Sequence, residues 1–413
     1  MPTIKIRKDD KKRPNLRFSE FSSDWQELPI GEFLNQKIRE IPKPNTPYKA
    51  IGIRSHFKGT FQKPNSDPAK IAMEKLFIVK QDDLVVNITF AWEGALAIVT
   101  EVDDGGLVSH RFPTYVFDEE KILKEYFRYV FPTKRFKYVL TTISPGGAGR
   151  NRVLNKKDFL TIGINLPTIH EQQKIADFLT KVDEYIKNIT AKKEKLEAYK
   201  KGMMQKIFSQ EIRFKDHNGK DFPEWKDNRL GEIATFLKGK GISKAEIDMN
   251  GTNKCIRYGE LYTDYNEVIE NVVSKTNVSK QRSILSEIND ILIPSSGETP
   301  IDIATASCIN ESDILIGGDL NIIRLKKGHD GIFFAYYLTN NEKINIAKMA
   351  QGNSVVHLYN SHLRKLKIYV PSLEEQQKIA DFLSSIDNLI EAKHTQISKA
   401  KNWKKGLLQQ LFV

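Results

Sequence analysis

Cysteine is scarce in this chain, which contains only Cys255 and Cys308 among its 413 residues. The two cysteines lie far apart, and neither has a His or Cys nearby at the spacing that metal ligands require. This pattern argues against a disulfide framework and a structural zinc site, and it fits a reducing cytoplasm. Long apolar runs are also missing, since no stretch approaches the ~18 uninterrupted apolar residues of a membrane span.

The motifs of common catalytic sites are absent as well. No Gly-x4-Gly-Lys-Ser/Thr loop occurs, no Gly-x-Gly-x-x-Gly follows a strand, and no histidines form a His-Glu-x-x-His pattern. The dense glycine cluster from Gly146 to Gly149 favours a tight turn over a phosphate-binding loop. His170 and Glu171 lie on a lysine-rich stretch, where we expect a solvated charged face and not acid–base catalysis. The sequence therefore favours a binding protein over an enzyme.

Positive charge is the first signal of a partner. The chain has 64 Lys and Arg against 52 Asp and Glu, and its net charge of +12 points to a polyanion. Much of the excess lies in residues 1–17, which lack an apolar run and are predicted to form a flexible basic arm and not a signal peptide. The basic residues of this arm are Lys5, Arg7, Lys8, Lys11, Lys12, Arg13 and Arg17.

An internal repeat organises the rest of the chain. Residues 166–208 recur as residues 370–412 in register and without a gap, so that Glu171 corresponds to Glu375, and the nine residues EQQKIADFL are identical in both copies. Ordinary helical patterning does not require such identity. The chain therefore contains a duplicated element.

Each copy of the repeat is predicted to be a long helix. Apolar residues recur at a spacing of seven with others offset by three, and no proline follows Pro167 or Pro371 within either copy. About 40 residues at ~1.5 Å each make a rod of roughly 60 Å, and we expect the two rods to pair antiparallel as a coiled coil. The predicted seam consists of Ile175, Phe178, Val182, Tyr185, Ile189, Leu196, Tyr199 and Met203 in the first copy, and Ile379, Phe382, Ile386, Leu389, Trp403 and Leu407 in the second.

A globular region precedes each helix, and a short lead-in segment precedes each globular region. The lead-in segments share a Trp-x5-Gly-Glu pattern that begins at Trp25 and at Trp225. Both regions mix short apolar strands, such as those after Asp83 and Asp290, with a predicted helix at 119–131 or 331–348. The predicted fold class is α+β, with two mixed α/β domains of one fold, two long helices and an internal pseudo-twofold repeat. The predicted segments are the arm (1–17), first globular region (18–166), first long helix (167–209), linker and second lead-in segment (210–224), second globular region (225–370) and second long helix (371–413).

Candidate nucleic-acid contacts come from polar and basic residues in loops of the two globular regions. Arg has the fork geometry that reads guanine edges, Asn suits adenine, and Lys suits phosphate. For any single residue an exposed loop charge explains the sequence equally well, but such clusters recur in both halves. The candidates are Arg54, His56, Lys58, Lys63, His110, Arg111, Arg150, Asn151 and Arg152 in the first region, and Lys238, Lys240, Lys244, Arg257, Tyr258, Asn353, Ser354 and His357 in the second. We expect Trp25, Trp92 and Trp225 to be core anchors and not base-stacking platforms.

Two copies of Pro-x3-EQQKIADFL, each preceded by a variable domain and a Trp-x5-Gly-Glu lead-in, resemble the specificity subunit of type I restriction-modification enzymes. The resemblance covers the chain from about Leu16 to Val413. It implies that the globular regions are target recognition domains, each reading one half of a split DNA sequence. It also implies that the helices are spacers that dock two modification subunits. At ~3.4 Å per base pair, a rod of roughly 60 Å holds the two domains no more than about 18 base pairs apart, and docking on one face of DNA favours a gap of ~10 base pairs.

The same resemblance implies that S-adenosylmethionine, ATP and Mg act in partner subunits, that restriction subunits join through the complex, and that this chain is non-catalytic. The residues then expected to serve docking and spacing are Gln172, Gln173, Ile175, Phe178, Leu179, Val182, Gln376, Gln377, Ile379, Phe382, Leu383 and Ile386. Two alternatives stay open: a specificity subunit for a methyltransferase without a restriction partner, and a coiled-coil protein scaffold without DNA specificity.

Overall fold

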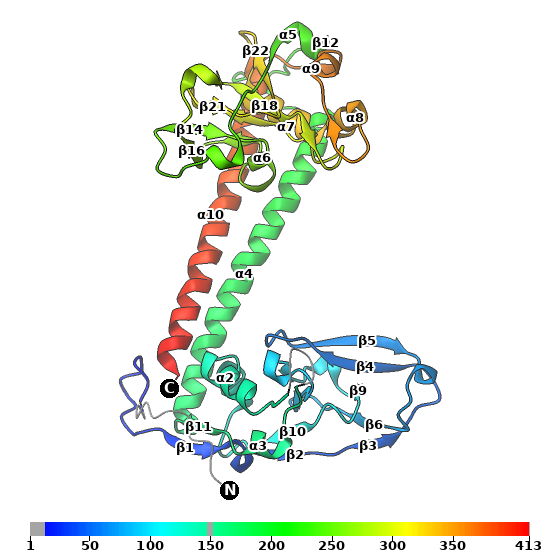
Figure 1. The fold of residues 1–413 in the computed structure, drawn as a ribbon, viewed down its shortest axis with the longest axis vertical. Helices are drawn as coiled ribbons and strands as arrows, with labels where there is room; N and C mark the ends of the chain where they lie inside the picture. Colours follow the sequence, from blue (N-terminus) through cyan, green and yellow to red (C-terminus); the bar gives the residue numbers. More distant parts are fainter. Residues whose placement is uncertain (1–12, 147–151, 413) are drawn as a thin grey trace. The chain divides into compact units, whose positions relative to one another are not determined.

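A computed structural model describes residues 13–146 and 152–412 (Figure 1). Most of the predicted basic arm, most of the glycine cluster, and the candidates Arg150 and Asn151 lie outside the described residues. The chain forms two compact units: unit 1 is Met1–Ile189 with Gln396–Val413, and unit 2 is Thr190–Thr395. Each unit therefore contains one half of each long helix, α4 (Ile169–Phe208) and α10 (Leu373–Leu411), and the linear segment boundaries drawn from the sequence stay a prediction.

The described residues of unit 1 form three sheets. A two-stranded ribbon pairs β1 with β11, a four-stranded sheet has the order β2-β10-β7-β8, and a five-stranded sheet has the order β3-β6-β9-β4-β5. The strands are β1 Gln26–Pro29, β2 Leu34–Gln36, β3 Glu40–Pro42, β4 Tyr48–Ile53, β5 Thr60–Ser66, β6 Lys75–Ile78, β7 Leu84–Val86, β8 Leu96–Ile98, β9 Leu107–Val108, β10 Thr114–Phe117 and β11 Gly163–Leu166; the short helices are α1 Lys124–Val130, α2 Lys134–Thr142 and α3 Lys156–Leu160, with 3-10 turns at Ile30–Glu32 (η1), Pro68–Lys70 (η2), Ala91–Glu93 (η3) and Glu101–Asp103 (η4).

Unit 2 repeats this plan. Its sheets have the orders β12-β24, β13-β22-β18-β20-β15, β16-β14-β21-β17 and β19-β23. The strands are β12 Lys226–Arg229, β13 Ala234–Lys238, β14 Asn253–Ile256, β15 Val268–Ile269, β16 Ser274–Thr276, β17 Ile284–Leu285, β18 Asp290–Pro294, β19 Ser296–Gly297, β20 Ser307–Ile309, β21 Leu315–Ile316, β22 Leu320–Leu325, β23 Val356–His357 and β24 Lys367–Val370; the short helices are α5 Leu230–Ile233, α6 Glu260–Thr263, α7 Gly331–Asn340, α8 Lys343–Met349 and α9 Asn360–Leu363, with 3-10 turns at Lys244–Glu246 (η5) and Lys280–Arg282 (η6).

The two globular regions share one fold, as predicted. The order β2-β10-β7-β8 in unit 1 corresponds to β13-β22-β18-β20 in unit 2, and β5-β4-β9-β6 corresponds to β16-β14-β21-β17. One parallel pair recurs as well, because β4 runs parallel to β9 and β14 runs parallel to β21; the parallel pair β15–β20 of unit 2 has no counterpart among the described strands of unit 1. Each unit also buries an aspartate at the beginning of an equivalent strand. Asp83, just before β7, pairs with Arg39, and Asp290, the first residue of β18, pairs with Arg324.

Both predicted globular helices differ from the structure, the first in length and the second by a break. The helix predicted at 119–131 is limited to α1, and Pro132 separates α1 from α2 because proline supplies no backbone N–H and disfavours a helical conformation before it. The helix predicted at 331–348 is two helices, α7 and α8, with a break at Asn341 and Glu342. Trp25 and Trp225 are buried core residues as predicted, but Trp92 is partly exposed.

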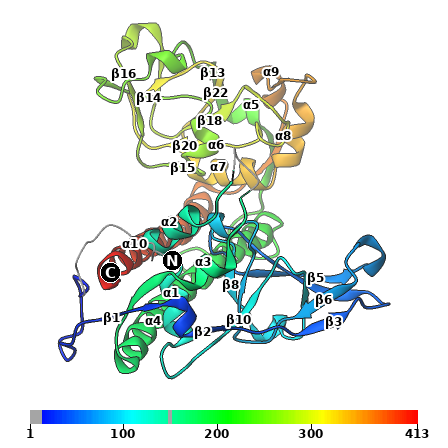
Figure 2. The same cartoon turned by 60° about the horizontal axis from the view of Figure 1, so that its bottom comes forward.

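Within each unit, the long helices pair antiparallel. In unit 1 both views draw the start of α4 beside the end of α10 (Figure 1, Figure 2). The rings of Phe178 and Trp403 lie 6.0 Å apart there, and Ile189 packs with Ile397 and Ala400. Unit 2 repeats the aromatic contact between Phe382 and Tyr199, at 6.5 Å.

The buried stripe of the helices is wider than the predicted heptad seam. Ile175, Ala176, Leu179 and Val182 are all buried, because the start of α4 packs against the globular core as well as against α10. Four predicted seam residues are instead about half exposed, namely Tyr185, Tyr199, Leu389 and Trp403. Trp403 and Tyr199 nevertheless contact the facing helix through Phe178 and Phe382, as predicted for seam residues.

Candidate nucleic-acid interface

Three loops of unit 1 meet at Ile88, just beyond the end of β7. The Ile88 N–H donates to the carbonyl of Arg111 at 3.0 Å, and the Ile88 carbonyl accepts from the N–H of Leu154 at 2.8 Å. These bonds bring together the loop after β7, the turn before β10 and the segment before α3. His110, Arg111 and Arg152 are thereby placed at one end of the β2-β10-β7-β8 sheet.

The β4–β5 hairpin adds a fourth segment to this end of unit 1. The N–H groups of His56 and Phe57 donate to the carbonyls of Glu93 and Gly94, each at 2.8 Å. Both donors adopt positive φ, 61° and 56°, a conformation that costs free energy for residues other than glycine. Two successive positive φ values turn the hairpin tip onto η3, and Lys58 is exposed at that tip.

Two cation–π pairs fix arginines on this face. The guanidinium of Arg54 lies 5.3 Å from the centre of the Phe61 ring, and Lys63 lies 5.8 Å from the same ring. The guanidinium of Arg152 lies 5.3 Å from the ring of Trp92. A guanidinium held against an aromatic ring is pre-organised and keeps N–H donors at its edge. The Trp92 ring therefore holds Arg152, one of the candidate DNA contacts. The prediction that Trp92 is a core anchor was wrong.

Unit 2 builds the same junction at Ser295. The Ser295 N–H donates to Asp319 at 2.7 Å, and its carbonyl accepts from Leu358 at 2.9 Å. The side chains differ from those of unit 1, because the loops here carry exposed aromatic rings. Tyr258 and Tyr262 lie 6.3 Å apart, and His357 and Tyr359 also lie 6.3 Å apart. Ser296 joins the two aromatic pairs. It pairs with His357 in the β19–β23 ribbon, and its carbonyl accepts a hydrogen bond from the Tyr262 hydroxyl at 3.4 Å.

Basic candidates of unit 2 reach the same end through β13. The Lys240 N–H donates to Ile316 at 3.0 Å, and the Gly317 N–H donates to Ile256 at 2.8 Å, so Lys238, Lys240 and Arg257 border one loop. Arg257 Nε lies 3.5 Å from the Glu260 carboxylate. Lys244 lies elsewhere, in η5, where Glu246 accepts from Thr276. Asn353 and Ser354 are exposed in a turn that the Gln351–His357 bridge closes.

The sequence reasoning missed further residues at this face. Lys37 and Lys156 line a hollow of about 130 Å³ in unit 1 together with His110. The Lys37 N–H donates to Thr114 at 2.9 Å, as the Gly239 N–H donates to Leu320 at 2.8 Å, so Lys37 follows β2 as the Lys238–Lys240 segment follows β13. Aligning the two halves strand by strand would have found Lys37. Tyr262 and Tyr359 had no signal beyond their aromatic character.

The acid of the duplicated motif is buried, not solvated. Glu171 is 0% exposed, and it accepts from Arg17 Nε and Nη2 at 2.7 Å each and from Trp25 Nε1 at 3.3 Å. The hydrogen bond to Glu171 raises the pKa of Arg17 further above its usual value. The prediction of a solvated charged face was therefore wrong for Glu171, while His170 is exposed as expected.

The same arrangement recurs in unit 2. Glu375 is fully buried and accepts from Arg213 at 3.1 and 2.8 Å and from Trp225 at 3.2 Å. In both units the carboxylate therefore ties the lead-in segment to the first turn of a long helix. This explains why the helix-opening Glu and the lead-in Trp occur together in each half.

The first glutamine of each EQQ ties the helix to its globular region. Gln172 accepts from the N–H of Leu123 at 3.0 Å and donates to Pro167, and Gln376 accepts from the N–H of Asp330 at 2.8 Å and donates to Pro371. Of the residues expected to serve docking and spacing, the buried ones pack within the chain; these are Gln172, Ile175, Leu179, Val182, Gln376, Ile379, Leu383 and Ile386. Gln173 and Gln377 are exposed, and Phe178 and Phe382 are partly exposed. The docking role stays a prediction.

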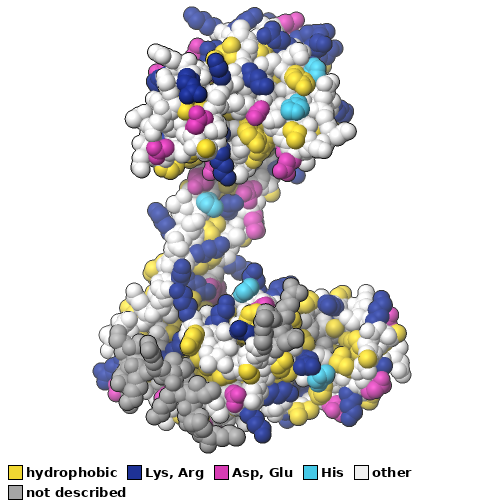
Figure 3. All heavy atoms as spheres, viewed as in Figure 1, with side chains coloured by type: hydrophobic (Ala, Val, Ile, Leu, Met, Phe, Trp, Pro, Cys, Tyr) yellow, Lys and Arg dark blue, Asp and Glu magenta, His cyan; other side chains and the backbone are white. Residues whose placement is uncertain are grey.

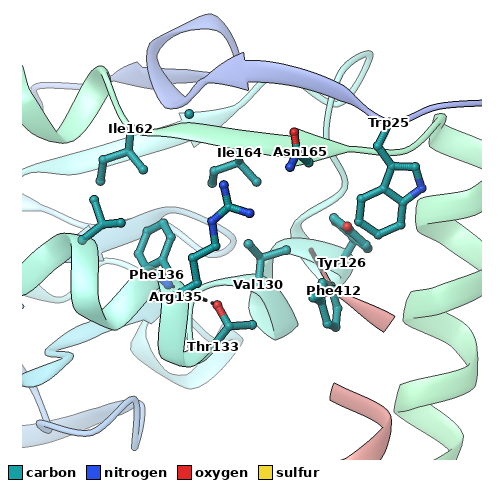
Figure 4. A pocket seen from close by; sticks show the side chains of 12 residues that line it. Trp25, Tyr126, Val130, Thr133, Arg135, Phe136, Ile162, Ile164, Asn165 and Phe412 are labelled. Atoms are coloured by element: carbon teal, nitrogen blue, oxygen red, sulfur yellow. Dashed lines mark hydrogen bonds between the residues drawn. The ribbon is translucent and has the colours of Figure 1, made fainter. Parts of the chain in front are cut away.

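A small hollow lies beside Trp25 in unit 1. Figure 4 shows Trp25, Tyr126 and Phe412 at one end and Arg135 reaching toward Ile164. Its volume is about 30 Å³, far below the ~300–1,000 Å³ of small-molecule sites. In the described ranges, 13–146 and 152–412, no three His, Cys, Asp or Glu side chains form a group suited to a metal ion. No helix in the same ranges is sufficiently long and apolar to span a membrane.

Known proteins match both halves of this chain. The family model of the type I restriction modification DNA specificity domain matches residues 22–198 and again residues 223–402. The type I restriction enzyme MjaVIII specificity subunit of Methanocaldococcus jannaschii is 27% identical over 405 residues, which cover 94% of this chain and 92% of that protein. The putative MjaX specificity subunit of the same organism is 27% identical over 299 residues, 71% of this chain and 68% of that protein.

A solved structure shares the fold. The type I restriction-modification system S subunit from M. genitalium aligns with a TM-score of 0.58 at 16% identity, over 97% of this chain and 99% of that chain. The family expected from the duplicated EQQKIADFL motif is confirmed. Because the family model matches both halves, the chain belongs to the type I restriction modification DNA specificity domain family and contains two copies of that domain.

Proposed function

We propose that this chain is the DNA-recognition subunit of a type I restriction–modification complex, in which each unit reads one half of a split target. The observation that carries the proposal is the recurrence of one loop junction, at Ile88 and at Ser295, with different side chains around it. A shared scaffold with different reading residues is what two readers of unlike half-sequences require. The relatives named above, which are specificity subunits, support the same function.

The chemistry of each face suits DNA. In unit 1, Arg54 and Arg152 present guanidinium groups braced by rings, and bidentate arginine contacts favour guanine in the major groove. Lys37, Lys58 and Lys63 suit phosphates, which position the protein without specifying sequence.

Unit 2 presents tyrosine and histidine rings with Arg257 and Lys240, so we expect its half-sequence to differ. Figure 3 shows Lys and Arg side chains on this unit interspersed with apolar and histidine side chains. Tyrosine rings and hydroxyls give apolar contact and hydrogen bonding in one side chain. This mixture supports reading of base edges in addition to phosphate binding.

The long helices are proposed to set the gap between half-sequences and to dock two modification subunits. Exposed apolar residues occur at equivalent positions of the repeat, with Tyr185 and Trp403 in unit 1 and Leu389 and Tyr199 in unit 2. Such exposed side chains suit a protein partner. We expect the chain to be non-catalytic and to bind no cofactor, with S-adenosylmethionine, ATP and Mg in the partner subunits and restriction subunits joined through the complex.

A map of methylated adenines tests this function. The chain is expressed with its neighbouring modification subunit in a host free of adenine methylation, and we expect a split motif with two defined halves around a fixed gap. Exchanging residues 25–166 for those of a relative is expected to change one half only. If the complex assembles but methylates nothing, and the chain binds DNA without sequence preference, the scaffold alternative replaces this proposal.

A further inference from the structure

A groove in unit 1 lies between the α1–α2 turn and the C-terminal end of α10. Its volume is about 460 Å³, and its apolar lining comes from Tyr129, Pro132, Leu408 and Phe412. Leu408 and Phe412 are only partly buried, and Phe412 packs 5.5 Å from the ring of Tyr126. The groove thus exposes apolar surface at the end of a long helix.

Five cations surround this apolar floor. One of them, Lys404, already has an anionic partner, because it forms an ion pair with Asp183. It also lies 5.4 Å from the centre of the Tyr129 ring. The other four are Lys134, Arg135, Lys401 and Lys405, and no carboxylate of the described residues lies within ion-pairing distance of any of them. The rim therefore has an uncompensated positive charge.

The corresponding place in unit 2 differs in charge. Shifting by the repeat distance, Glu197 occupies the position of Lys401, and Lys200 occupies that of Lys404. Lys200 is neutralised by Glu267 at 3.0 Å and by Asp387 at 2.8 Å.

The turn between α7 and α8 also differs from its counterpart. It carries Glu342 and is followed by Lys343 and Ile344, whereas the α1–α2 turn of unit 1 is followed by two cations, Lys134 and Arg135. The pseudo-symmetry of the fold is therefore not a symmetry of charge.

We propose that the unit 1 groove binds an acidic, amphipathic helical segment of a partner protein, and that the equivalent surface of unit 2 binds such a segment far more weakly. An apolar floor favours an apolar anchor, and the rim of cations favours carboxylates beside that anchor. Helix-in-groove binding uses this combination. DNA fits less well, because a phosphate backbone offers no apolar group to the floor.

The probe is a fluorescein-labelled synthetic helix with leucines every three or four residues and glutamates elsewhere. Its control is a peptide of the same composition with the leucines scattered around the helix. Binding to the full chain is measured by fluorescence anisotropy. We expect Lys401→Glu combined with Lys405→Glu to weaken binding of the first peptide by about 10- to 100-fold. Lys201→Glu, at the position in unit 2 that corresponds to Lys405, is expected to change it little.

A photo-crosslinking residue locates the bound peptide. Gln409 lines the groove, and Gln205 is its equivalent in unit 2; both are exposed. Crosslinking from position 409 and not from position 205 supports the proposal. Arg135→Glu tests the opposite wall independently of α10.

Three results overturn the inference. These are equal crosslinking from both positions, equal loss of affinity with Lys201→Glu, and crosslinking of a labelled DNA duplex at position 409 in place of the peptide. The test uses the chain without its DNA target, so it does not depend on the recognition function. Circular dichroism of each variant verifies that the helices remain folded.

Discussion

Replacing Glu171 by glutamine removes the charge that Arg17 and Trp25 share in unit 1. Arg17 donates two bonds of 2.7 Å to this carboxylate, and the Arg17 side chain is only 12% exposed. Glutamine keeps the shape of the side chain but offers a single acceptor oxygen, and its NH2 group faces a donor. The guanidinium is then left mostly buried without its counter-charge.

The expected cost follows from that geometry. Removing one partner of a buried ion pair costs about 3–5 kcal/mol. Two effects reduce this cost, because Arg17 keeps some contact with solvent and the glutamine oxygen still accepts one hydrogen bond. We therefore expect Glu171→Gln to lower the free energy of unfolding of unit 1 by about 2–4 kcal/mol. Replacing both partners, with Arg17→Met and Glu171→Leu, is expected to recover much of this loss, since no unpaired charge remains.

Hydrogen exchange measured by mass spectrometry under increasing urea assigns the loss to one unit. Glu375→Gln is the matched control, because Glu375 holds Arg213 and Trp225 in unit 2 in the same way. Each variant is expected to lower protection in its own unit. A loss below about 1 kcal/mol for Glu171→Gln, or a double variant as unstable as the single one, would refute the reasoning.

Three further predictions concern unit 1, unit 2 and the DNA face. Burial raises the pKa of Asp103, but hydrogen bonds, including one from Thr60 at 2.6 Å, outweigh it and hold the pKa below its usual value. Its contribution to stability is therefore complete above the ordinary aspartate pKa of ~3.9 and is lost as pH falls through the lower folded value. Asp103→Asn is expected to remove this acid-dependent loss from unfolding curves recorded across pH; an unchanged pH dependence contradicts it. Arg152→Ala is expected to cost about 1–3 kcal/mol of binding and to relax preference at one base pair, measured against single-base variants of the target duplex; a uniform loss across all variants would make Arg152 a phosphate contact. Gly239→Ala places a Cβ 2.0 Å from the carbonyl oxygen of Gly317, so we expect it to lower the free energy of unfolding by about 1–3 kcal/mol. Urea titrations measure this loss, and an unchanged free energy of unfolding would show that the backbone of this loop shifts to make room for the methyl group.

Repeated patterns in the sequence predicted the architecture well. The identical EQQKIADFL stretches and the shared Trp-x5-Gly-Glu lead-in gave the long helices, the two-fold plan and the family. Hydrophobic periodicity predicted both helices to within two residues at each end, Ile169–Phe208 and Leu373–Leu411. Local patterns suffice for these features because helix formation depends on side chains three and four residues apart.

The individual roles of residues were less predictable. Glu171 reads as one more acid on a lysine-rich helix, yet its partner Arg17 lies 154 residues away in sequence. Tyr185 and Leu389 fit the heptad spacing but are half exposed, because the globular regions cover other faces of the same helices. Trp92 reads as a core residue and instead supports Arg152.

The sequence by itself determined that this protein is a duplicated pair of α/β domains with two long helices, and that it belongs to a DNA-specificity family. Tertiary structure alone decided which loops meet at Ile88 and Ser295, and which charges are neutralised. It also decided that the end of α10 borders an open basic groove while Lys200 of α4 is paired with Glu267 and Asp387. The physical reason is that periodicity is set by neighbours in sequence and a repeat is visible by comparing two stretches of it, whereas burial and ion pairing depend on groups that only the folded chain brings together.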